Sequence, residues 1–460
     1  MLRSFRLRNH RSFRDEHEFL LMPVYDKGRS ALPVAAVYGA NASGKSNLLD
    51  GLRFMAEAVR DSFGQWSPGG GVPRRAFKLD REARERPSIF VVEIVEGGVR
   101  YTYGFEVDDE RVLAEWLYSY PEKRKRILFE RTLDDVRFGR ATSRDQAKLE
   151  VLEELLRPGS LFLSLAAQSN ITALLPVYRW FVDGLEFRLA GDASGLEREV
   201  SDFIQDDEDS RVRLLDLLRA ADFGISDVVA GGETDARLES LEIWWKNDLQ
   251  ALEERRVQLI GGFQELGDSV AMAEQELVHV ESGIVEYRTR LASLRRALEE
   301  SRRRVSLVHG AESFDLEEES AGTRSWLGLL PPVLGVLRDG GVLVIDEIDA
   351  SLHSLLSARL IGLFNDPVSN PGGGQLIFTT HDASLLHPPL AGEVLDRDEV
   401  WFVEKDANGA SALYPLTDFK PRHEDNLERR YLAGQYGAVP QVYEELFTRA
   451  VRGGSDDGEA

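Results

Sequence analysis

The residues best suited to chemistry lie between positions 39 and 47. They read Gly39-Ala40-Asn41-Ala42-Ser43-Gly44-Lys45-Ser46-Asn47, and the first eight fit the P-loop pattern G-x-x-x-x-G-K-[ST]. Glycines let backbone N–H groups turn toward phosphates, and a following helix N-terminus adds partial positive charge. We therefore expect Lys45 to reach the β- and γ-phosphates of a nucleotide and Ser46 to bind Mg²⁺.

A second reactive group is an acidic pair at the end of an apolar run. Asp346 and Glu347 directly follow Val342-Leu343-Val344-Ile345. Carboxylates at the end of a buried strand are costly unless they meet a cation or act on a water molecule. We expect Asp346 to contact Mg²⁺ through water and Glu347 to orient and polarise the attacking water.

Both groups need buried strands to position them. Residues 33–38 (PVAAVY) form a continuous apolar run of the kind found in central parallel strands, and an amphipathic helix follows the loop. Residues 341–345, 375–379 and 399–404 predict further buried strands. The beginning and the end of the chain therefore both indicate a parallel α/β architecture.

Other patterns lie between these segments. Residues 2–7 and 19–21 predict a β-hairpin, and residues 89–95, 99–107 and 112–120 predict antiparallel strands with Gly97-Gly98 at a turn. Helical patterns dominate residues 144–218. We therefore expect antiparallel and helical material inserted into the α/β core.

The most regular segment runs from Leu249 to Leu298, where apolar residues alternate in steps of three and four, with Arg256 as a polar interruption. This heptad pattern predicts a coiled coil. The glycines at 261, 262 and 267 allow two antiparallel arms, each on the order of 40 Å long. A helix packed on its own domain is the alternative, and the pattern does not decide whether the coil pairs within or between chains.

Composition limits the classes of function. Hydrophobic residues make up 43% and charged residues 29% of the 460, which is typical of soluble globular proteins, and we expect a cytoplasmic protein with no membrane partner. The chain has no cysteine, which excludes disulfides, thiolate zinc sites and iron–sulfur clusters. Its net charge of −23 argues against a uniformly basic nucleic-acid-binding surface.

The long separation of the P-loop from the acidic pair, with a heptad segment between them, resembles the ABC-type ATPases of the SMC, RecF and OLD group. That resemblance implies ATP and Mg²⁺ as ligands. In it, Arg11 and Ser12 match the N-terminal strand–turn that borders the nucleotide base. Gln168 is the candidate for the Q-loop residue, a ligand of Mg²⁺ and water.

Three further motifs of this group are matched near the end of the chain. Ser320-Ala321-Gly322-Thr323 resembles the ABC signature, although Ala321 replaces its first glycine. Asp349 matches the D-loop, and His381, after Thr379-Thr380, matches the switch histidine that touches the γ-phosphate. The resemblance implies that Ser320 and Gly322 bind the γ-phosphate of a nucleotide on a second protomer.

The C-terminal segments indicate a smaller group within the families that the chain resembles. Residues 398–405, 413–416 and 429–440 resemble the bacterial AAA-15-type ATP/GTP phosphatase group, which is similar to the ATPase subunits of anti-phage operons. The resemblance covers about residues 1–445. The residues themselves predict only a strand pair followed by an aromatic, glycine-bearing segment.

The resemblance implies a head-to-tail homodimer with ATP sandwiched between the protomers, alone or in a larger oligomer. It also implies a sensor subunit that controls a separately encoded effector, such as a Toprim-type or other nuclease, with DNA or a phage protein as candidate trigger. The rival is a RecF- or SMC-like DNA clamp in genome maintenance; the net charge of −23 weighs against it, whereas the arginines at 295–296 and 302–304 leave it open. The presence of Lys45, Asp346 and Glu347 argues against a purely structural scaffold with an inactive nucleotide site.

The predicted fold class is α/β, an ABC-type P-loop ATPase head with an antiparallel β subdomain, a helical lobe and a coiled-coil insertion. The expected boundaries are residues 1–143 for the N-terminal ATPase lobe, 144–240 for the helical lobe, 241–304 for the coil, 305–450 for the C-terminal ATPase lobe and 451–460 for a disordered tail.

Overall fold

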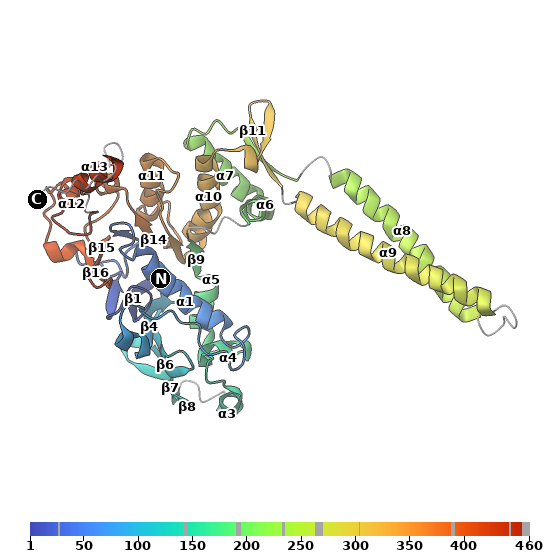
Figure 1. Cartoon of the computed structure of the whole chain (residues 1–460), viewed down its shortest axis with the longest axis horizontal. Coiled ribbons are helices and arrows are strands. Elements are labelled where there is room, and N and C mark those ends of the chain that lie inside the picture. The colour runs from blue at the N-terminus through green and yellow to red at the C-terminus, as the bar shows by residue number, and fades with distance from the viewer. Residues whose placement is uncertain are drawn as a thin grey trace, which may run out of the picture. The chain divides into compact units, whose positions relative to one another are not determined.

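The computed structural model describes residues 1–25, 28–140, 146–189, 195–231, 235–262, 270–302, 304–387, 392–440 and 443–452. The chain divides into two compact units, Met1–Asp192 with Gly335–Ala460, and Ala193–Leu334 (Figure 1). The first unit thus joins the two ends of the sequence, and the expected lobe boundaries stay predictions.

A six-stranded sheet forms the centre of the first unit. Its order is β16 (Ser411–Pro415), β15 (Val400–Lys405), β3 (Val34–Tyr38), β14 (Gln375–Thr380), β13 (Val342–Ile345) and β9 (Leu185–Arg188). All neighbours pair in parallel except β16, which runs antiparallel to β15. Strands β3, β13 and β14 are buried, as expected from their apolar sequences, which are typical of central parallel strands. Their carboxyl ends lie at the same edge of the sheet.

Strand β9 was not predicted, because it lies in a stretch where helical patterns dominate. It has only four residues, too few for an alternating pattern to distinguish it from the end of the preceding helix. It pairs in parallel with β13 along residues 342–345 and forms the edge of the sheet.

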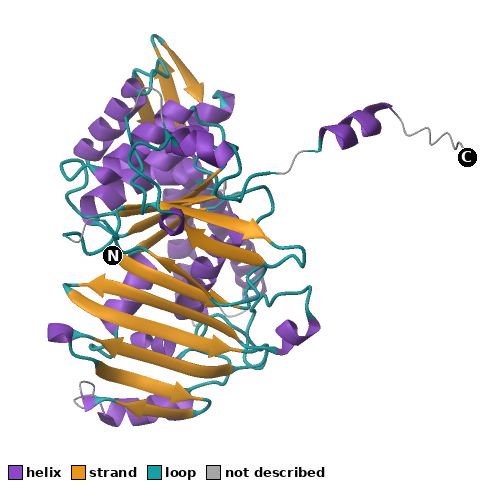
Figure 2. Cartoon of the chain, turned by 90° about the vertical axis from the view of Figure 1, so that its left-hand side faces the viewer, coloured by secondary structure: helices purple, strands orange, loops and turns teal. Residues whose placement is uncertain are grey.

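A seven-stranded antiparallel sheet forms the predicted β subdomain (Figure 2). Its order is β2 (His17–Leu20), β1 (Leu2–Arg8), β4 (Ser88–Glu96), β5 (Val99–Val107), β6 (Val112–Ser119), β7 (Arg126–Thr132) and β8 (Asp135–Phe138). Glu96 pairs with Val99 across Gly97 and Gly98, which both have positive φ, so the predicted hairpin turn is confirmed.

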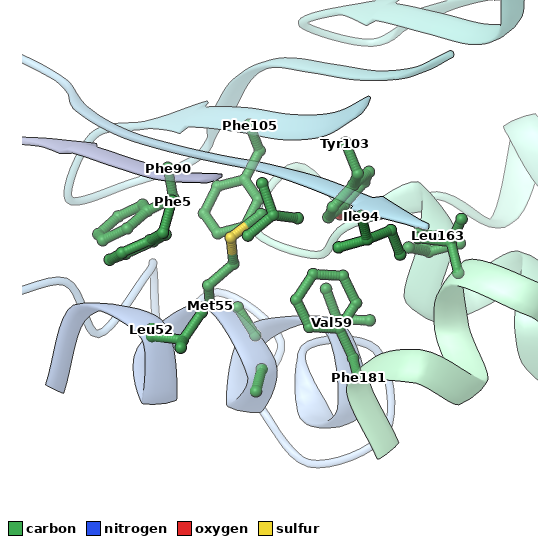
Figure 3. Packing of buried hydrophobic residues seen from close by; sticks show 14 of the residues in the cluster. Phe5, Leu52, Met55, Val59, Phe90, Ile94, Tyr103, Phe105, Leu163 and Phe181 are labelled. Carbon is green, nitrogen blue, oxygen red and sulfur yellow. The ribbon is translucent and has the colours of Figure 1, made fainter. Parts of the chain in front are cut away.

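Helix α1 (Lys45–Asp61) packs against the inner face of this sheet. Leu52, Met55 and Val59 lie beneath Phe90 and Phe105 in one apolar core (Figure 3). Helices α4 (Phe162–Gln168) and α5 (Leu175–Asp183) contribute to the same core. The remaining helices of this unit are α2 (Arg81–Glu85), α3 (Gln146–Leu155), α11 (Ser354–Asn365), α12 (Leu427–Leu432) and α13 (Glu444–Arg452).

The second unit holds the helical lobe and the coil. It contains α6 (Leu196–Asp206), α7 (Glu208–Ala220), the first part of α10 (Ala321–Asp339) and a sheet of β10 (Asp227–Ala230), β11 (Val305–His309) and β12 (Glu312–Asp315). Helices α8 (Asp235–Gly262) and α9 (Val270–Arg302) lie side by side and antiparallel (Figure 1).

The coil is a hairpin within one chain. Leu259, Val280 and Ile284 form its buried core, and the ion pairs Arg255–Glu276 (2.7 Å) and Arg295–Glu242 (2.9 Å) join its two helices. Helix α8 ends at Gly262, as two of the three glycines predict, and Gly267 lies outside the described residues.

The structure confirms the predicted α/β architecture, with an antiparallel β subdomain, a helical lobe and a coiled-coil insertion. The expected disordered tail lies outside the described residues, except for residues 451–452, which end α13. Among the described helices, none combines the length and the apolar character needed to cross a membrane.

Candidate functional site

The predicted P-loop connects β3 to α1, so its backbone leads directly into a helix N-terminus. Lys45 is buried, and its Nζ donates to the carbonyls of Gly39 (2.8 Å) and Ala40 (3.2 Å), which holds the ammonium group across the loop. Burial lowers the pKa of Lys45, while the carboxylates of Glu347 and Asp346 oppose the change. The lysine is therefore held across the loop, near enough to the acidic pair for its carboxylates to act on the lysine's pKa.

Two loop positions require glycine for steric reasons. A Cβ on Gly39 would clash with the carbonyl of Val403 and lie 2.7 Å from Ser43 Oγ. Gly44 has φ +119° at the cap of α1, and a Cβ there would clash with Ser411 Oγ. Both glycines therefore permit close approach of the backbone, and Gly44 also adopts a conformation that other residues rarely take.

The predicted Mg²⁺ ligands lie together. Ser46 Oγ donates to Asp346 Oδ1 at 3.1 Å, joining the first turn of α1 to the end of β13. Thr379, at the end of β14, donates to the same oxygen at 2.5 Å. Two elements, α1 and β14, thus hold the carboxylate that follows β13, and Thr379 is a site residue as well as part of the predicted histidine motif.

The predicted catalytic residues also lie at this edge of the sheet. Glu347 has a positive φ of 56°, and its backbone N–H donates to Thr379 Oγ1 at 2.7 Å, which fixes the turn after β13. His381 Nε2 lies 3.7 Å from Glu347 Oε1, and its Nδ1 lies 3.4 Å from Lys45 Nζ. The structure therefore brings together Lys45, Glu347 and His381.

Asp349 holds the loop that carries this histidine. Its Oδ1 accepts from Thr380 Oγ1 at 2.6 Å and from the backbone N–H of His381 at 3.3 Å. The predicted D-loop residue therefore lies beside the switch histidine within one chain.

A layer of hydroxyl groups supports the P-loop. Asn47 Nδ2 donates to Ser12 Oγ at 2.7 Å, Ser411 Oγ donates to the carbonyl of Ser43 at 2.5 Å, and the hydroxyl oxygens of Ser12 and Ser411 lie 2.7 Å apart. Ser12 and Asn47 thus lie close to the loop, and their contact with a nucleotide stays a prediction. Ser411 was missed, because its partners lie almost four hundred positions away and no local motif marks it.

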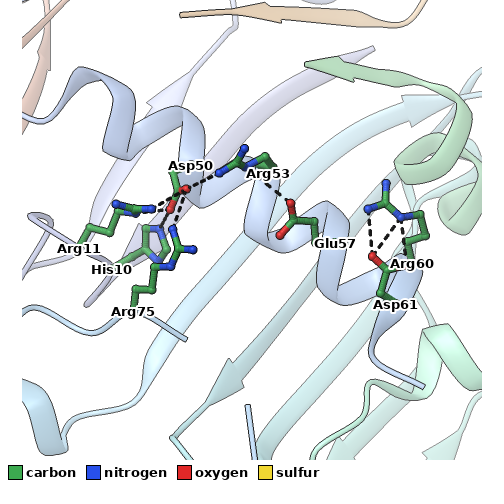
Figure 4. A network of polar contacts seen from close by, with 8 residues as sticks. All are labelled: His10, Arg11, Asp50, Arg53, Glu57, Arg60, Asp61 and Arg75. Carbon is green, nitrogen blue, oxygen red and sulfur yellow. Dashed lines mark hydrogen bonds and ion pairs between the residues drawn. The ribbon is translucent and has the colours of Figure 1, made fainter. Parts of the chain in front are cut away.

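Arg11 forms part of a separate network (Figure 4). Its Nη2 lies 2.9 Å from Asp50 Oδ1 on α1, and His10 Nε2 lies 2.9 Å from Asp50 Oδ2. Arg53 and Arg75 also pair with this carboxylate, at 3.1 and 3.3 Å. Burial would raise the pKa of Asp50, but its hydrogen bonds to His10 and Arg11 lower it to about 2. Contact of Arg11 with a nucleotide base stays a prediction.

Gln168 does not join the predicted Mg²⁺ ligands. Its amide lies beside Gly64, beyond the C-terminal end of α1, whereas Ser46 lies at the N-terminal end. A helix of this length separates the two by about 25 Å. The sequence assignment therefore fails in this structure, because an apolar run before a glutamine does not fix its position.

The predicted signature lies in the second unit. Ser320 precedes α10, and its Oγ accepts from the backbone N–H of Thr323 at 3.1 Å. This is the geometry of an N-cap, with Gly322 in the first turn, so the expected helix start is confirmed. Contact of Ser320 and Gly322 with a phosphate stays a prediction.

The site has the chemical groups that ATP and Mg²⁺ require. Lys45 supplies a cation, Ser46 and Asp346 supply the oxygen ligands that Mg²⁺ prefers, and Ser43 Oγ is buried with no partner among the described residues. Across the described parts of the chain, no cluster of three or more histidine and acidic residues forms a metal site. The site therefore fits a metal bound jointly by two protein oxygens, phosphate and water.

A family model described as "AAA domain, putative AbiEii toxin, Type IV TA system" matches residues 34–241 and 247–387, which is well over half of the chain. The match begins at the first residue of β3 and ends beyond His381, so it includes the predicted P-loop, the acidic pair and the predicted switch histidine. No curated protein matches the chain.

Solved structures similar to the chain include SMC heads. An SMC head bound to the C-terminal winged-helix domain of ScpA is 12% identical, with 91% of this chain and 99% of that chain covered and a TM-score of 0.46. The SMC head domain from Thermotoga maritima is 14% identical, with coverages of 90% and 98% and a TM-score of 0.38. A head with an extended coiled coil from Pyrococcus furiosus is also 14% identical, with coverages of 91% and 97% and a TM-score of 0.38.

Proposed function

Because the chain belongs to the family of AAA domains described as putative AbiEii toxin, Type IV TA system, we propose that it binds ATP with Mg²⁺ and hydrolyses it to ADP and phosphate. The observation that carries this proposal is the gathering of Lys45, Ser46, Asp346, Glu347 and His381 at one edge of the central sheet. Phosphoryl transfer depends mainly on positioning and charge stabilisation, and these residues supply both.

Each residue has a distinct role in this proposal. Lys45 binds the terminal phosphates, and Ser46 with Asp346 holds Mg²⁺, which neutralises phosphate charge when bound. Glu347 orients the attacking water, and His381 contacts the γ-phosphate. The positive φ of Glu347 and its backbone bond to Thr379 support a fixed carboxylate position.

We further propose that the complete site forms between two copies of the chain. Ser320 and Gly322 of one copy would bind the γ-phosphate held by the P-loop of the other. The capped start of α10 supports this role, because a helix N-terminus with a serine hydroxyl is suited to bind an anion.

In the cell, we propose that ATP state controls a separately encoded effector, as in the ATPase subunits of anti-phage operons. A nuclease is the effector class that this resemblance indicates, with DNA or a phage protein as trigger. ATP then acts as the conformational signal.

The catalytic proposal is tested by measuring ATP binding and phosphate release in wild type, Lys45→Ala and Glu347→Gln. Loss of the lysine should abolish binding, whereas the glutamine variant should bind ATP normally and release phosphate at least about 100-fold more slowly. Equal hydrolysis by Glu347→Gln and wild type would exclude Glu347 as the water-orienting residue.

A second candidate function is a DNA clamp, which the arginine cluster around Asp50 favours. Arg11, Arg53 and Arg75 share the carboxylate of Asp50, and Arg53 also pairs with Glu57, so three arginines face two acids here in a chain of net charge −23. DNA affinity that falls steeply with salt and weakens in Arg53→Glu would support the clamp. Salt-independent or absent DNA binding would favour effector control.

A further inference from the structure

Tyr38 is a buried residue at the end of β3, directly before Gly39 of the P-loop. Its side chain is 0% exposed, and its hydroxyl has no hydrogen-bond partner among the described residues. A hydroxyl buried in this way has given up its bonds to water without replacing them, which is unfavourable unless the group is used. The roles proposed above for the site residues do not use it.

Aromatic contacts fix the direction of this side chain. The Tyr38 ring makes an edge contact with Tyr431 on α12, with ring centroids 5.5 Å apart, and a tilted contact with Phe402 at 6.3 Å. Phe402 is also the partner of Tyr38 in the pairing of β3 with β15. Because buried rings are closely packed, the hydroxyl cannot turn away without moving its neighbours.

The strand on the other side of Tyr38 leads into the loop that carries His381. Thr380, the last residue of β14, is the register partner of Tyr38. His381 and Asp382 follow it, and Asp382 caps the short 3₁₀ turn η5 (Ala383–Leu386), on which α12 also packs. Burial is the main cause that raises the pKa of Tyr38, and the Asp382 carboxylate is the next. The two groups therefore lie close enough to interact electrostatically.

One oxygen of the Asp382 carboxylate is available as an acceptor. The backbone N–H and the hydroxyl of Ser384 both donate to Asp382 Oδ1, at 2.9 and 2.6 Å. Among the described residues, no hydrogen bond goes to Oδ2. Since an ionised carboxylate accepts on both oxygens, a small shift of this loop would give the tyrosine hydroxyl a partner.

We propose that Tyr38 is a positioning residue for His381: as the histidine engages the γ-phosphate in the hydrolytic step, the tyrosine hydroxyl donates to Asp382 Oδ2 and fixes the loop. This inference rests on the proposed ATP hydrolysis and on the proposed role of His381. The rigid ring of Tyr38 would hold the histidine loop in register with the P-loop, which begins at the next residue. Tyr38 itself touches no reacting atom.

The variant Tyr38→Phe removes only the hydroxyl, and steady-state ATP hydrolysis with Mg²⁺ measures the consequence. We expect kcat to fall about tenfold with KM unchanged, because the lost hydrogen bond is made in the hydrolytic step and not on binding. The melting temperature without nucleotide should stay at the wild-type value or rise, because the variant loses a buried polar group that has no partner. A merely structural role would instead lower the melting temperature and leave kcat unchanged.

The matched control is Tyr103→Phe. Tyr103 is equally buried in the same unit, but its hydroxyl donates to Glu115 at 2.9 Å. This variant should lower the melting temperature, because it leaves a buried carboxylate with one hydrogen bond fewer, and it should keep the wild-type kcat. A comparable loss of kcat in Tyr103→Phe would overturn the inference, since a general loss of packing would then explain the effect.

A further variant, Asp382→Ala, tests the acceptor. It should lower kcat by itself, and adding Tyr38→Phe should cause no further loss, because both changes remove the same hydrogen bond. Losses of kcat that multiply would overturn the pairing of Tyr38 with Asp382. Wild-type kcat in Tyr38→Phe would overturn the inference and leave ATP hydrolysis by the chain intact, whereas no hydrolysis by the wild-type chain would overturn the proposed function itself.

Discussion

At the scale of single residues, the site depends on backbone positions as much as on reactive side chains. The hydroxyl groups of Ser12 and Ser411 pack against the P-loop backbone, and they come closest to it at Gly44. A side chain at Gly44 would have to displace both serines and adopt a left-handed backbone conformation. The conformation of the loop therefore depends on the packing of these two serines as well as on the glycine itself.

Gly44→Ala should lower ATP affinity by on the order of tenfold, because the loop would relax away from its left-handed conformation and binding would have to restore it at a cost of about 1–2 kcal/mol. Isothermal titration with ATP and Mg²⁺ measures the change. Gly362→Ala in α11 is the matched control, since no atom lies near a Cβ at that position. That control should bind ATP normally and unfold at a higher temperature, because alanine is favoured in helices. Normal affinity in Gly44→Ala would contradict the packing argument.

Glu399, a buried acid directly before the first residue of β15, predicts that the stability of the fold depends on pH. Burial raises the pKa of Glu399 from an ordinary value of 4.5 to about 8, and its Oε1 has no partner among the described residues. The nearby carboxylates of Asp396 and Asp398 add to the increase. Between these pH values the folded chain holds a proton that the unfolded chain releases.

This acid should make the wild-type chain less stable as pH rises from about 5 to 8, by up to about 1.4 kcal/mol per pH unit. Glu399→Gln resembles the protonated form and should lack this contribution. Urea unfolding at several pH values would therefore give curves that diverge as pH increases, with the variant the more stable at pH 8. Parallel pH dependence would show that Glu399 ionises normally.

The reactive residues were predictable because each lies in a local pattern. Lys45 and Ser46 follow a defined loop motif, and Asp346, Glu347 and His381 follow apolar strands whose carboxyl ends must meet at one edge. Gln168 was placed by an apolar run alone, which fixes no neighbour. Ser411 could not be predicted, because its contacts with Ser12 and Ser43 depend on how β16 folds back onto the loop.

At the scale of secondary structure elements, periodicity predicted the long segments better than the short ones. The coil was predicted because many heptads repeat, and the glycine pair at its middle marked the end of α8. Strand β9 was missed because four residues carry no clear period, and its place is decided by pairing with β13. Whether such a short segment forms a strand is decided by its pairing with a neighbouring strand rather than by the intrinsic preferences of its residues.

The coil gives a matched test of its own packing. Ile284 is 5% exposed between the two helices, whereas Val285 beside it is 64% exposed. Ile284→Asp should separate α8 from α9 locally, because it buries a charge and removes apolar contacts at a cost of about 3 kcal/mol or more. Limited proteolysis should then cut these helices faster, while Val285→Asp should be cut at the wild-type rate. Equal cleavage of the two variants would argue against the hairpin register.

At the scale of the whole molecule, the dimer proposal means that one chain alone lacks part of the ATP site, namely the Ser320 segment of a second copy. Lys45 and Glu347 act in one copy, since His381 contacts both of them, whereas Ser320 would serve the opposite copy. A pair of inactive variants can therefore complement each other only when their changes fall on different sides of the interface.

Lys45→Ala and Ser320→Arg should each be inactive alone and regain ATP hydrolysis when mixed. The expected recovery is up to about a quarter of the wild-type rate, because random exchange makes half of the dimers mixed and each mixed dimer holds one complete site. Lys45→Ala mixed with Glu347→Gln is the matched control and should stay inactive, because both residues belong to the same half of a site. Recovery in both mixtures would mean that Glu347 also acts across the interface, and recovery in neither would place the whole site within one chain.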